Sequence, residues 1–138
     1  MTVIKSYLNK PYRWGGDDPS GIDCSGLIIE GLKAIGVLKE KEDFTAESLY
    51  HHLLKLKESN QFQIKEISQP QKGALIFFQN DDNRIYHCSI ALNLYFQIGA
   101  MGGDATTISK EKALAQNAFV KIRPISNRVE LRYLSIFG

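Results

Sequence analysis

Cysteine is scarce in this sequence, with only Cys24 and Cys88 among 138 residues. A small domain held together by disulfides carries several cysteine pairs, and a structural zinc site needs closely spaced pairs of ligands. Neither pattern is present, so the sequence excludes a disulfide framework and gives no sign of a zinc site. At least one of the two cysteines therefore needs a different explanation.

Long apolar runs and a strong excess of one charge are absent as well. The longest purely apolar stretches, such as residues 74–78, have four or five residues, whereas a helix that spans a membrane needs about 20. Lysine and arginine number 17 against 15 aspartate and glutamate, and the basic residues are scattered, which argues against nucleic-acid binding. The proportions of 43% hydrophobic and 23% charged residues fit one globular domain over residues 1–138.

Hydrophobic periodicity predicts helices first and strands second. Apolar residues recur at helical spacing from a cap at Asp23 to Gly36 and again over 45–57, and a short helix fits residues 2–8. The glycine-rich residues 11–21 predict a loop. Strands are expected at 62–67, 74–78, 85–92, 95–100, 119–123 and 131–137, with a helix at 109–116. This order is typical of an α+β fold in which N-terminal helices pack on an antiparallel sheet.

Cys24 falls in the first turn of the helix that Asp23 caps. A thiol is nucleophilic as the thiolate, and its pKa falls at a helix N-terminus, where backbone N–H groups present partial positive charge. The nearby Gly21 and Gly26 leave room for a substrate carbonyl. A small buried apolar residue is the commoner role of a cysteine, but few structural needs explain this surrounding sequence.

A cysteine nucleophile needs a base, and His87, in a predicted strand, is the best of the three histidines. His51 and His52 are consecutive on a predicted helix rich in leucine and lysine, so we expect structural roles for both. Strand alternation places Cys88 on the face opposite His87. We therefore expect Cys88 in the core and no disulfide between Cys24 and Cys88.

Three motifs occur in order along the chain: PYRWGG at 11–16, DCSG at 23–26 and HCSIAL at 87–92. With them the sequence resembles the NlpC family of papain-like cysteine peptidases, over roughly residues 7–103. The first two motifs are specific at this spacing, whereas the histidine strand alone is weak. The resemblance implies a papain-like NlpC-type fold with the catalytic cysteine at a helix N-terminus. Residues 104–138 do not align, although 118–124 are similar to phage-encoded members.

The resemblance implies cleavage of peptidoglycan stem peptides, at the bond between D-γ-glutamyl and the diamino acid that follows it. Cys24 would attack the carbonyl as a thiolate, and His87 would protonate the leaving amine. Water would then hydrolyse the thioester acyl-enzyme. The backbone N–H of Cys24 is a natural donor to the oxyanion. This chemistry implies no metal and no cofactor.

The resemblance also implies residues that bind the substrate. Tyr12 is expected beside the oxyanion or the substrate, and Asp23 and Ser25 are expected to contact the stem peptide. A plain N-cap is an equal alternative for Asp23, and capping competes for Ser25 as well. For Trp14 we expect packing rather than substrate contact.

The sequence departs from the family at the third catalytic position. Family members usually carry a polar residue, often histidine, on the strand after the histidine strand, where it orients the imidazole. The residue in register here is Gly99, so we expect Gln97, on the same strand face, to take this catalytic role. A water, a backbone carbonyl or Asp104 are alternatives. Two smaller departures are Ala74, where the family tends to have aspartate, and Ser89, where it tends to have glycine.

These departures keep other functions open: a wall-binding or phage-tail papain-like domain that does not cut, and a papain-like amidase that removes the whole stem peptide. Residues 1–10 lack the apolar core and cleavage site of a secretory signal. We therefore expect synthesis in the cytoplasm and action at the cell wall, as a phage-tail or exported component. The expected partners are stem peptides, with a phage tail or an immunity protein in addition, and neither nucleic acid nor a membrane span.

Overall fold

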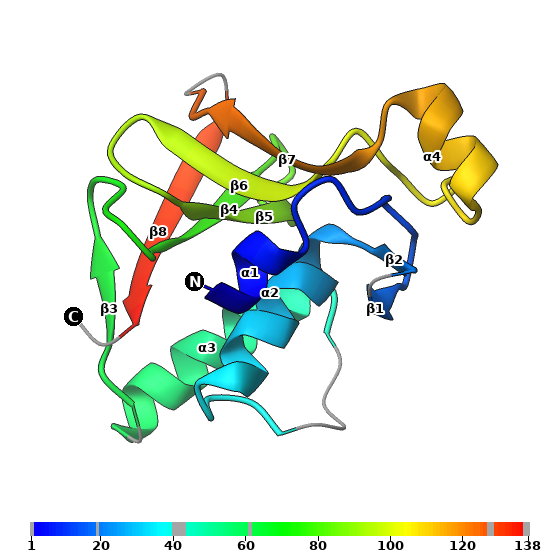
Figure 1. Ribbon diagram of the computed structural model, residues 1–138. Coiled ribbons are helices and arrows are strands. Elements are labelled where there is room, and N and C mark those ends of the chain that lie inside the picture. The colour runs from blue at the N-terminus through cyan, green and yellow to red at the C-terminus, as the bar shows by residue number, and fades with distance from the viewer. Residues whose placement is uncertain (1, 19, 40–43, 61, 127–128, 137–138) are drawn as a thin grey trace.

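The computed structural model describes residues 2–18, 20–39, 44–60, 62–126 and 129–136 (Figure 1). Within these residues the helices are α1 (Thr2–Ser6), α2 (Cys24–Ala34), α3 (Ala46–Ser59) and α4 (Lys110–Gln116). A small ribbon consists of β1 (Asp17–Asp18) and β2 (Gly21–Ile22). The main sheet consists of β3 (Ile64–Ile67), β4 (Leu75–Gln79), β5 (Ile85–Ala91), β6 (Phe96–Met101), β7 (Phe119–Pro124) and β8 (Glu130–Ile136).

The strands of the main sheet lie in the order β3-β8-β4-β5-β6-β7, and every neighbouring pair is antiparallel. From β4 to β7, strands that follow one another in sequence are neighbours in the sheet. The exception is β8, which inserts between β3 and β4, so that Leu134 lies opposite Glu66 on one side and Leu75 on the other. Strand β5, which carries His87, is therefore an interior strand.

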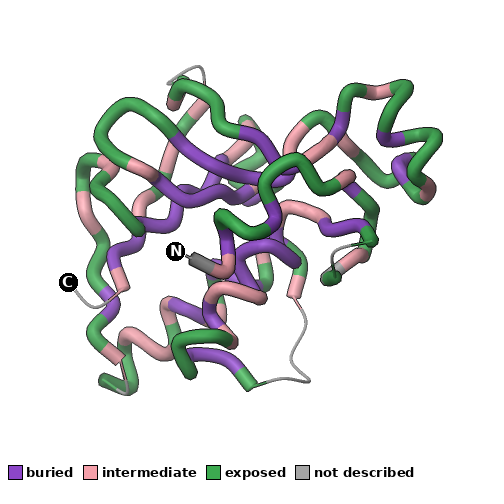
Figure 2. Tube along the Cα trace, viewed as in Figure 1, coloured by how far each residue is buried: buried purple, intermediate pink, exposed green. Residues whose placement is uncertain are grey.

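Helices α1, α2 and α3 lie on one side of the sheet, and α4 lies beyond the ends of β6 and β7 (Figure 1). The larger core fills the space between α1–α3 and the sheet, and Figure 2 shows the buried positions following α2 and the central strands. Its fully buried side chains include Leu27, Leu49, Phe77, Ile98 and Leu134. A smaller cluster around Ile76 and Phe78 covers the other face of the sheet. Because α2 is buried against β5 and β6, its N-terminus is held at a fixed place on the sheet.

The expected α+β fold is confirmed, and each predicted strand of the main sheet lies within two residues of its expected bounds. Helix α3 begins with a reciprocal cap, since Thr45 Oγ1 accepts from the N–H of Ser48 and Ser48 Oγ accepts from the N–H of Thr45. The loop expected over 11–21 is wrong in part, because it contains β1 and the first residue of β2. Strands of two residues are too short to show a period in the sequence. Among the described residues, no helix has the length and apolar character needed to cross a membrane.

Candidate active site

The site is built around the start of α2, where Asp23 is the N-cap. Its Oδ1 accepts from the N–H of Gly26 at 2.7 Å, and its Oδ2 accepts from the N–H of Gly15 at 2.9 Å. One carboxylate therefore caps the helix and ties the loop before it to the same point. Cys24 is the first residue of α2, so its backbone N–H belongs to the helix turn that has no intrahelical acceptor.

Gly26 allows the loop to approach α2 closely. A Cβ at this position would lie 2.4 Å from the carbonyl oxygen of Gly16 and 2.9 Å from Asp23 Oδ1. Because both contacts are too short for any side chain, glycine is required here. Gly26 thus serves the packing of the loop against α2.

The Cys24 thiol contacts both His87 and Cys88 of β5. The pKa of Cys24 lies well below its ordinary value, because the Cys88 thiol, then the His87 side chain and charge, and the backbone N–H of Cys88 stabilise the thiolate more than burial opposes it. The His87 ring lies against Phe78, with the ring centroids 4.9 Å apart. The structure therefore brings the predicted nucleophile and the predicted base together.

Cys88 faces the core, on the side of β5 opposite His87, as predicted. Cys88 is fully buried in the core and both cysteines are free thiols, as expected, and the Cys88 thiol lies close enough to Cys24 to affect its pKa. Strand alternation holds between the two residues, since Cys88 pairs with Phe77 of the main core and His87 pairs with Phe78 of the smaller cluster. The bulge of β5 lies just before them, where Tyr86 is the extra residue. A bulge bends the strand and increases its twist. The N-terminus of α2 thus meets two consecutive residues of β5.

Tyr12 is only 4% exposed, and the charge of Cys24 affects its pKa. Its ring packs on Gly103, where a Cβ would lie 2.2 Å from the ring carbon Cδ1. Burial raises the pKa of Tyr12 far above its ordinary value, and the negative charges of Cys24 and Asp23 raise it further. The hydroxyl therefore stays protonated and can act as a hydrogen-bond donor beside Cys24.

A cleft runs past Cys24 and has two sides. The side that we call the Asp23 side has a volume of about 700 Å³, and its lining includes Asp23, Ser25, Glu47 and Arg84. The side that we call the His87 side has a volume of about 500 Å³, and its lining includes His87, Gln97, Met101 and Asp104. Tyr12, Trp14, Cys24 and Tyr86 line both sides, so the sulfur lies where the two sides meet.

Polar groups of the Asp23 side are held in place by local hydrogen bonds. Ser25 is buried, and its Oγ donates to Asp23 Oδ1 at 3.3 Å. Burial raises the pKa of the Asp23 carboxyl, although the hydrogen bonds that it accepts act in the opposite direction.

The packing role predicted for Trp14 is not what the structure shows, because the indole is 54% exposed at the rim of the cleft.

The predicted third catalytic residue, Gln97, lines the His87 side, but its amide has other partners. The amide oxygen accepts from Ser89 Oγ at 2.5 Å, and the amide nitrogen donates to the carbonyl oxygen of Pro124 at 3.2 Å. An amide oxygen has two lone pairs, so one remains for a further donor. Gln97 as the residue that orients His87 stays a prediction.

The presence of a side chain at Ser89 and its absence at Gly99 are related. A Cβ at Gly99 would lie 3.0 Å from Ser89 Cβ and 3.2 Å from Met101 Cε, so the two positions share one space on the sheet face. A side chain at 99 would therefore crowd Ser89, whose side chain lies in this space. Asp104, the other candidate, accepts from both the N–H and the hydroxyl of Thr106, which lower the pKa of its carboxyl.

The other histidines take structural positions on α3, as expected. The ring of His52 stacks on Phe44 with centroids 4.7 Å apart, and His51 meets Tyr50 edge to face. Neither histidine lines the two sides of the cleft. Across the described residues, no three histidine, cysteine, aspartate or glutamate side chains are grouped as metal ligands would be.

Sequence reasoning missed Arg84, which lines the Asp23 side from the loop between β4 and β5. Asn80 fixes this loop, because its Oδ1 accepts from the N–H of Arg84 at 3.0 Å and its own N–H donates to the Arg84 carbonyl at 2.9 Å. Within the described part of the chain, Arg84 forms no ion pair. The only sequence signal was a basic residue in a hairpin shortly before the histidine strand.

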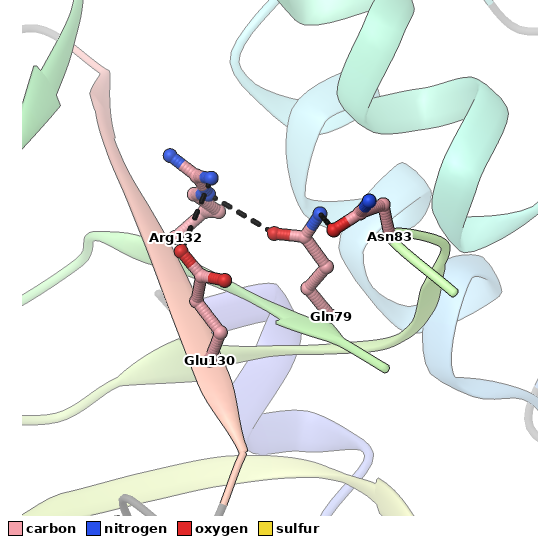
Figure 3. Close-up of polar contacts among 4 residues, drawn as sticks. All are labelled: Gln79, Asn83, Glu130 and Arg132. Carbon is pink, nitrogen blue, oxygen red and sulfur yellow. Dashed lines mark hydrogen bonds and ion pairs between the residues drawn. The ribbon is translucent and has the colours of Figure 1, made fainter. Parts of the chain in front are cut away.

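Figure 3 shows how the same hairpin is braced against β8. Arg132 donates from Nε to Gln79 Oε1 at 3.2 Å and pairs with Glu130 at 3.2 Å. Gln79 in turn donates to Asn83 Oδ1 at 3.4 Å. These contacts connect the loop that carries Arg84 to the last strand of the sheet.

Three curated proteins are similar to part of this sequence. They are Dipeptidyl-peptidase 6 from Lysinibacillus sphaericus (40% identity over 75 residues), Murein DD-endopeptidase MepH from Escherichia coli K12 (34% over 80) and Probable endopeptidase p60 from Listeria grayi (34% over 86). The matches cover 53%, 57% and 62% of this chain but only 23%, 26% and 14% of those proteins. This chain thus spans about a quarter or less of the relatives' length.

The fold also matches a solved structure, the NlpC/p60 domain of the peptidoglycan hydrolase SagA. The TM-score is 0.57 at 22% sequence identity, and the match covers 95% of this chain and 92% of that domain. The sequence profile of the NlpC/P60 family matches residues 9–134, which include Cys24, His87 and all strands from β1 to β7. This chain therefore belongs to the NlpC/P60 family.

Proposed function

We propose that this domain is a cysteine endopeptidase that hydrolyses peptidoglycan stem peptides between D-γ-glutamyl and the following diamino acid. The observation that carries the proposal is the contact of the Cys24 thiol with His87 at a helix N-terminus inside a cleft. The names of the relatives, two endopeptidases and a dipeptidyl-peptidase, support peptide cleavage. The name of MepH specifies a DD bond in murein, so a D,D linkage is the competing bond.

In the first half of the reaction, the Cys24 thiolate attacks the scissile carbonyl carbon and an S–C bond forms. The carbonyl electron pair moves onto oxygen, where the backbone N–H of Cys24 and the Tyr12 hydroxyl can donate hydrogen bonds. The protonated His87 then gives its proton to the amine as the C–N bond breaks. The leaving diamino acid therefore departs on the His87 side, and the acyl group stays on the Asp23 side.

In the second half, His87 takes a proton from water as the water oxygen attacks the thioester carbon. The C–S bond breaks, and Cys24 returns as a thiolate beside the protonated His87. The product is a new carboxylic acid on the acyl group. Nucleophile, base and water complete the cycle with no net change in the protein.

Arg84 supports a γ-glutamyl group on the acyl side. A γ-linked glutamate keeps its α-carboxylate free, whereas an ordinary α-peptide has no charge at that place. The unpaired guanidinium of Arg84 lines the Asp23 side, where this carboxylate would lie. The carboxylates of Asp23 and Glu47 line the same side and would suit a free amine at the N-terminus of the stem.

Product analysis tests the proposal. Defined stem peptides and muropeptides are incubated with the protein and with Cys24→Ala, and the products are identified by mass spectrometry. We expect fragments ending in D-γ-glutamate with the first protein and none with the variant. Cleavage at a D,D bond would replace the proposed bond, and release of whole stem peptides would indicate an amidase. No product from a folded, reduced protein would contradict an enzyme and favour a wall-binding domain.

A further inference from the structure

The two cysteines of the chain are neighbours in the fold, although they are far apart in the sequence. Cys88 of β5 is a member of the main core and is 0% exposed. Cys24, at the start of α2, packs against that same core, and the Cys88 thiol is the neighbour that most affects the pKa of Cys24. Helix α2 is buried against β5, so this contact belongs to the rigid part of the fold.

The two thiols differ in access and in ionisation. Cys24 is partly exposed and lines both sides of the cleft, so a small oxidant can reach it. Cys88 has no exposed surface, and the neighbouring Cys24 thiolate together with burial raises the pKa of Cys88 well above its ordinary value. The pair thus consists of a thiol that ionises readily and is reached from the cleft, and a thiol that ionises less readily and is shielded from solvent.

We propose that Cys88 is the resolving thiol of Cys24, so that a peroxide converts the pair into an internal disulfide that reversibly blocks the nucleophile. The Cys24 thiolate first attacks hydrogen peroxide: an S–O bond forms, the O–O bond breaks, and the hydroxide that leaves takes a proton to become water. Cys24 is then a neutral sulfenic acid, and the charge that opposed ionisation of Cys88 is gone.

In the second step the Cys88 sulfur attacks the Cys24 sulfur. The S–S bond forms and the S–O bond breaks, and the Cys88 proton leaves with the hydroxyl group as a second water. His87, which contacts Cys24, is the nearest base to carry this proton. Two thiols and one peroxide thus give one disulfide and two waters. The disulfide protects Cys24 from irreversible oxidation to the sulfinic acid.

The test measures thiols rather than peptidase activity, so it stands apart from the test of the proposed function. The reduced full-length protein is treated with hydrogen peroxide, denatured with N-ethylmaleimide and analysed by intact and peptide mass spectrometry. We expect loss of two hydrogen atoms, loss of both alkylation sites, a Cys24–Cys88 cross-linked peptide, and full reversal by dithiothreitol. A sulfinic acid on Cys24 with a free, alkylated Cys88 would overturn the proposal.

Two variants sharpen the result. In Cys88→Val the sulfenic acid has no partner, so we expect it to be trapped by dimedone and to oxidise further without reversal. In Cys24→Ser we expect Cys88 to resist peroxide, because it has no exposed surface. If Cys88→Val shows the same reversible oxidation as the unaltered chain, the proposal is wrong. Circular dichroism checks both folds, and the disulfide mapping of the unaltered chain needs neither variant.

Discussion

At the scale of single residues, the reactivity of Cys24 depends on the side chains around it. A hydrogen bond from the Cys88 thiol and the hydrogen bond and charge of His87 lower the pKa of Cys24, while burial alone would raise it. A lower pKa favours the thiolate, so Cys24 stays ionised at a more acidic pH than an unperturbed thiol does. A larger share of Cys24 is therefore ionised at neutral pH than in an unperturbed thiol.

The first prediction concerns the rate at which iodoacetamide alkylates Cys24 as a function of pH. We expect the midpoint of this rate to lie at a pH well below the ordinary thiol pKa. In Cys88→Val the midpoint should shift to higher pH, because the variant lacks the thiol that stabilises the Cys24 thiolate most. His51→Ala is the control, because this ring lies against Tyr50 on α3. An ordinary midpoint in the unaltered protein, or no shift in Cys88→Val, would contradict this account.

Arg84 gives a second prediction at the same scale. Replacing Arg84 by glutamine should lower kcat/KM about tenfold for a stem peptide with D-glutamate, as expected for loss of a charge-assisted hydrogen bond at an exposed position. The loss should be much smaller for the same peptide with D-isoglutamine, whose amide carries no charge. Arg123→Gln on β7, outside the two sides of the cleft, is the matched control. Equal losses on the two peptides would remove Arg84 from carboxylate recognition.

At the scale of elements, close backbone packing holds the loop before α2 against the start of this helix. Gly26 faces the carbonyl oxygen of Gly16, whereas Gly31, five residues further along α2, faces the flexible end of the Ile4 side chain. The first neighbour cannot move without breaking the loop, and the second can rotate away. The two glycines of this helix therefore differ in whether a larger residue can replace them.

The third prediction compares Gly26→Ala with Gly31→Ala by urea unfolding. Gly26→Ala should lower the free energy of unfolding by about 2–3 kcal/mol through overpacking. Gly31→Ala should change it by less than about 1 kcal/mol, because the gain in helix propensity offsets the adjustment of Ile4. Equal effects would show that the contact with Gly16 is not what requires glycine at 26.

At the scale of the whole molecule, β8 joins β3 to the strands that carry the site. Leu134 at its centre is fully buried in the main core, opposite Leu75 of β4. Through Arg132 and Gln79, β8 also braces the hairpin that holds Arg84. The last strand thus supports both the core and one wall of the cleft.

A fourth prediction follows for the stability of the fold. Leu134→Ala should lower the free energy of unfolding by about 2–5 kcal/mol, the range for a leucine removed from a packed core. Leu114→Ala, on α4 and 74% exposed, should change it by less than about 0.5 kcal/mol. Thermal unfolding followed by circular dichroism measures both. Similar melting temperatures for the two variants would show that β8 is not part of the cooperative core.

Local patterns predicted much of this molecule, because caps and periodicity act within a few residues. Asp23 as the cap of α2, the hairpin before His87 and the helices-then-sheet order all follow from neighbouring residues. The insertion of β8 and the contact of Cys88 with Cys24 depend on how distant segments pack together, which leaves no periodic signal. The phage-tail role and the place of action stay predictions.

The account rests on Cys24 as the nucleophile that holds the acyl group, and trapping of the acyl-enzyme tests this most directly. A defined stem peptide with D-γ-glutamate before the diamino acid is mixed with the protein, quenched in acid within the first turnover and digested for mass spectrometry. We predict an acyl group ending in γ-glutamate, attached as a thioester to Cys24 and absent from Cys24→Ala. Cleavage of the peptide by Cys24→Ala at an undiminished rate, or an acyl group on Cys88 instead, would contradict it.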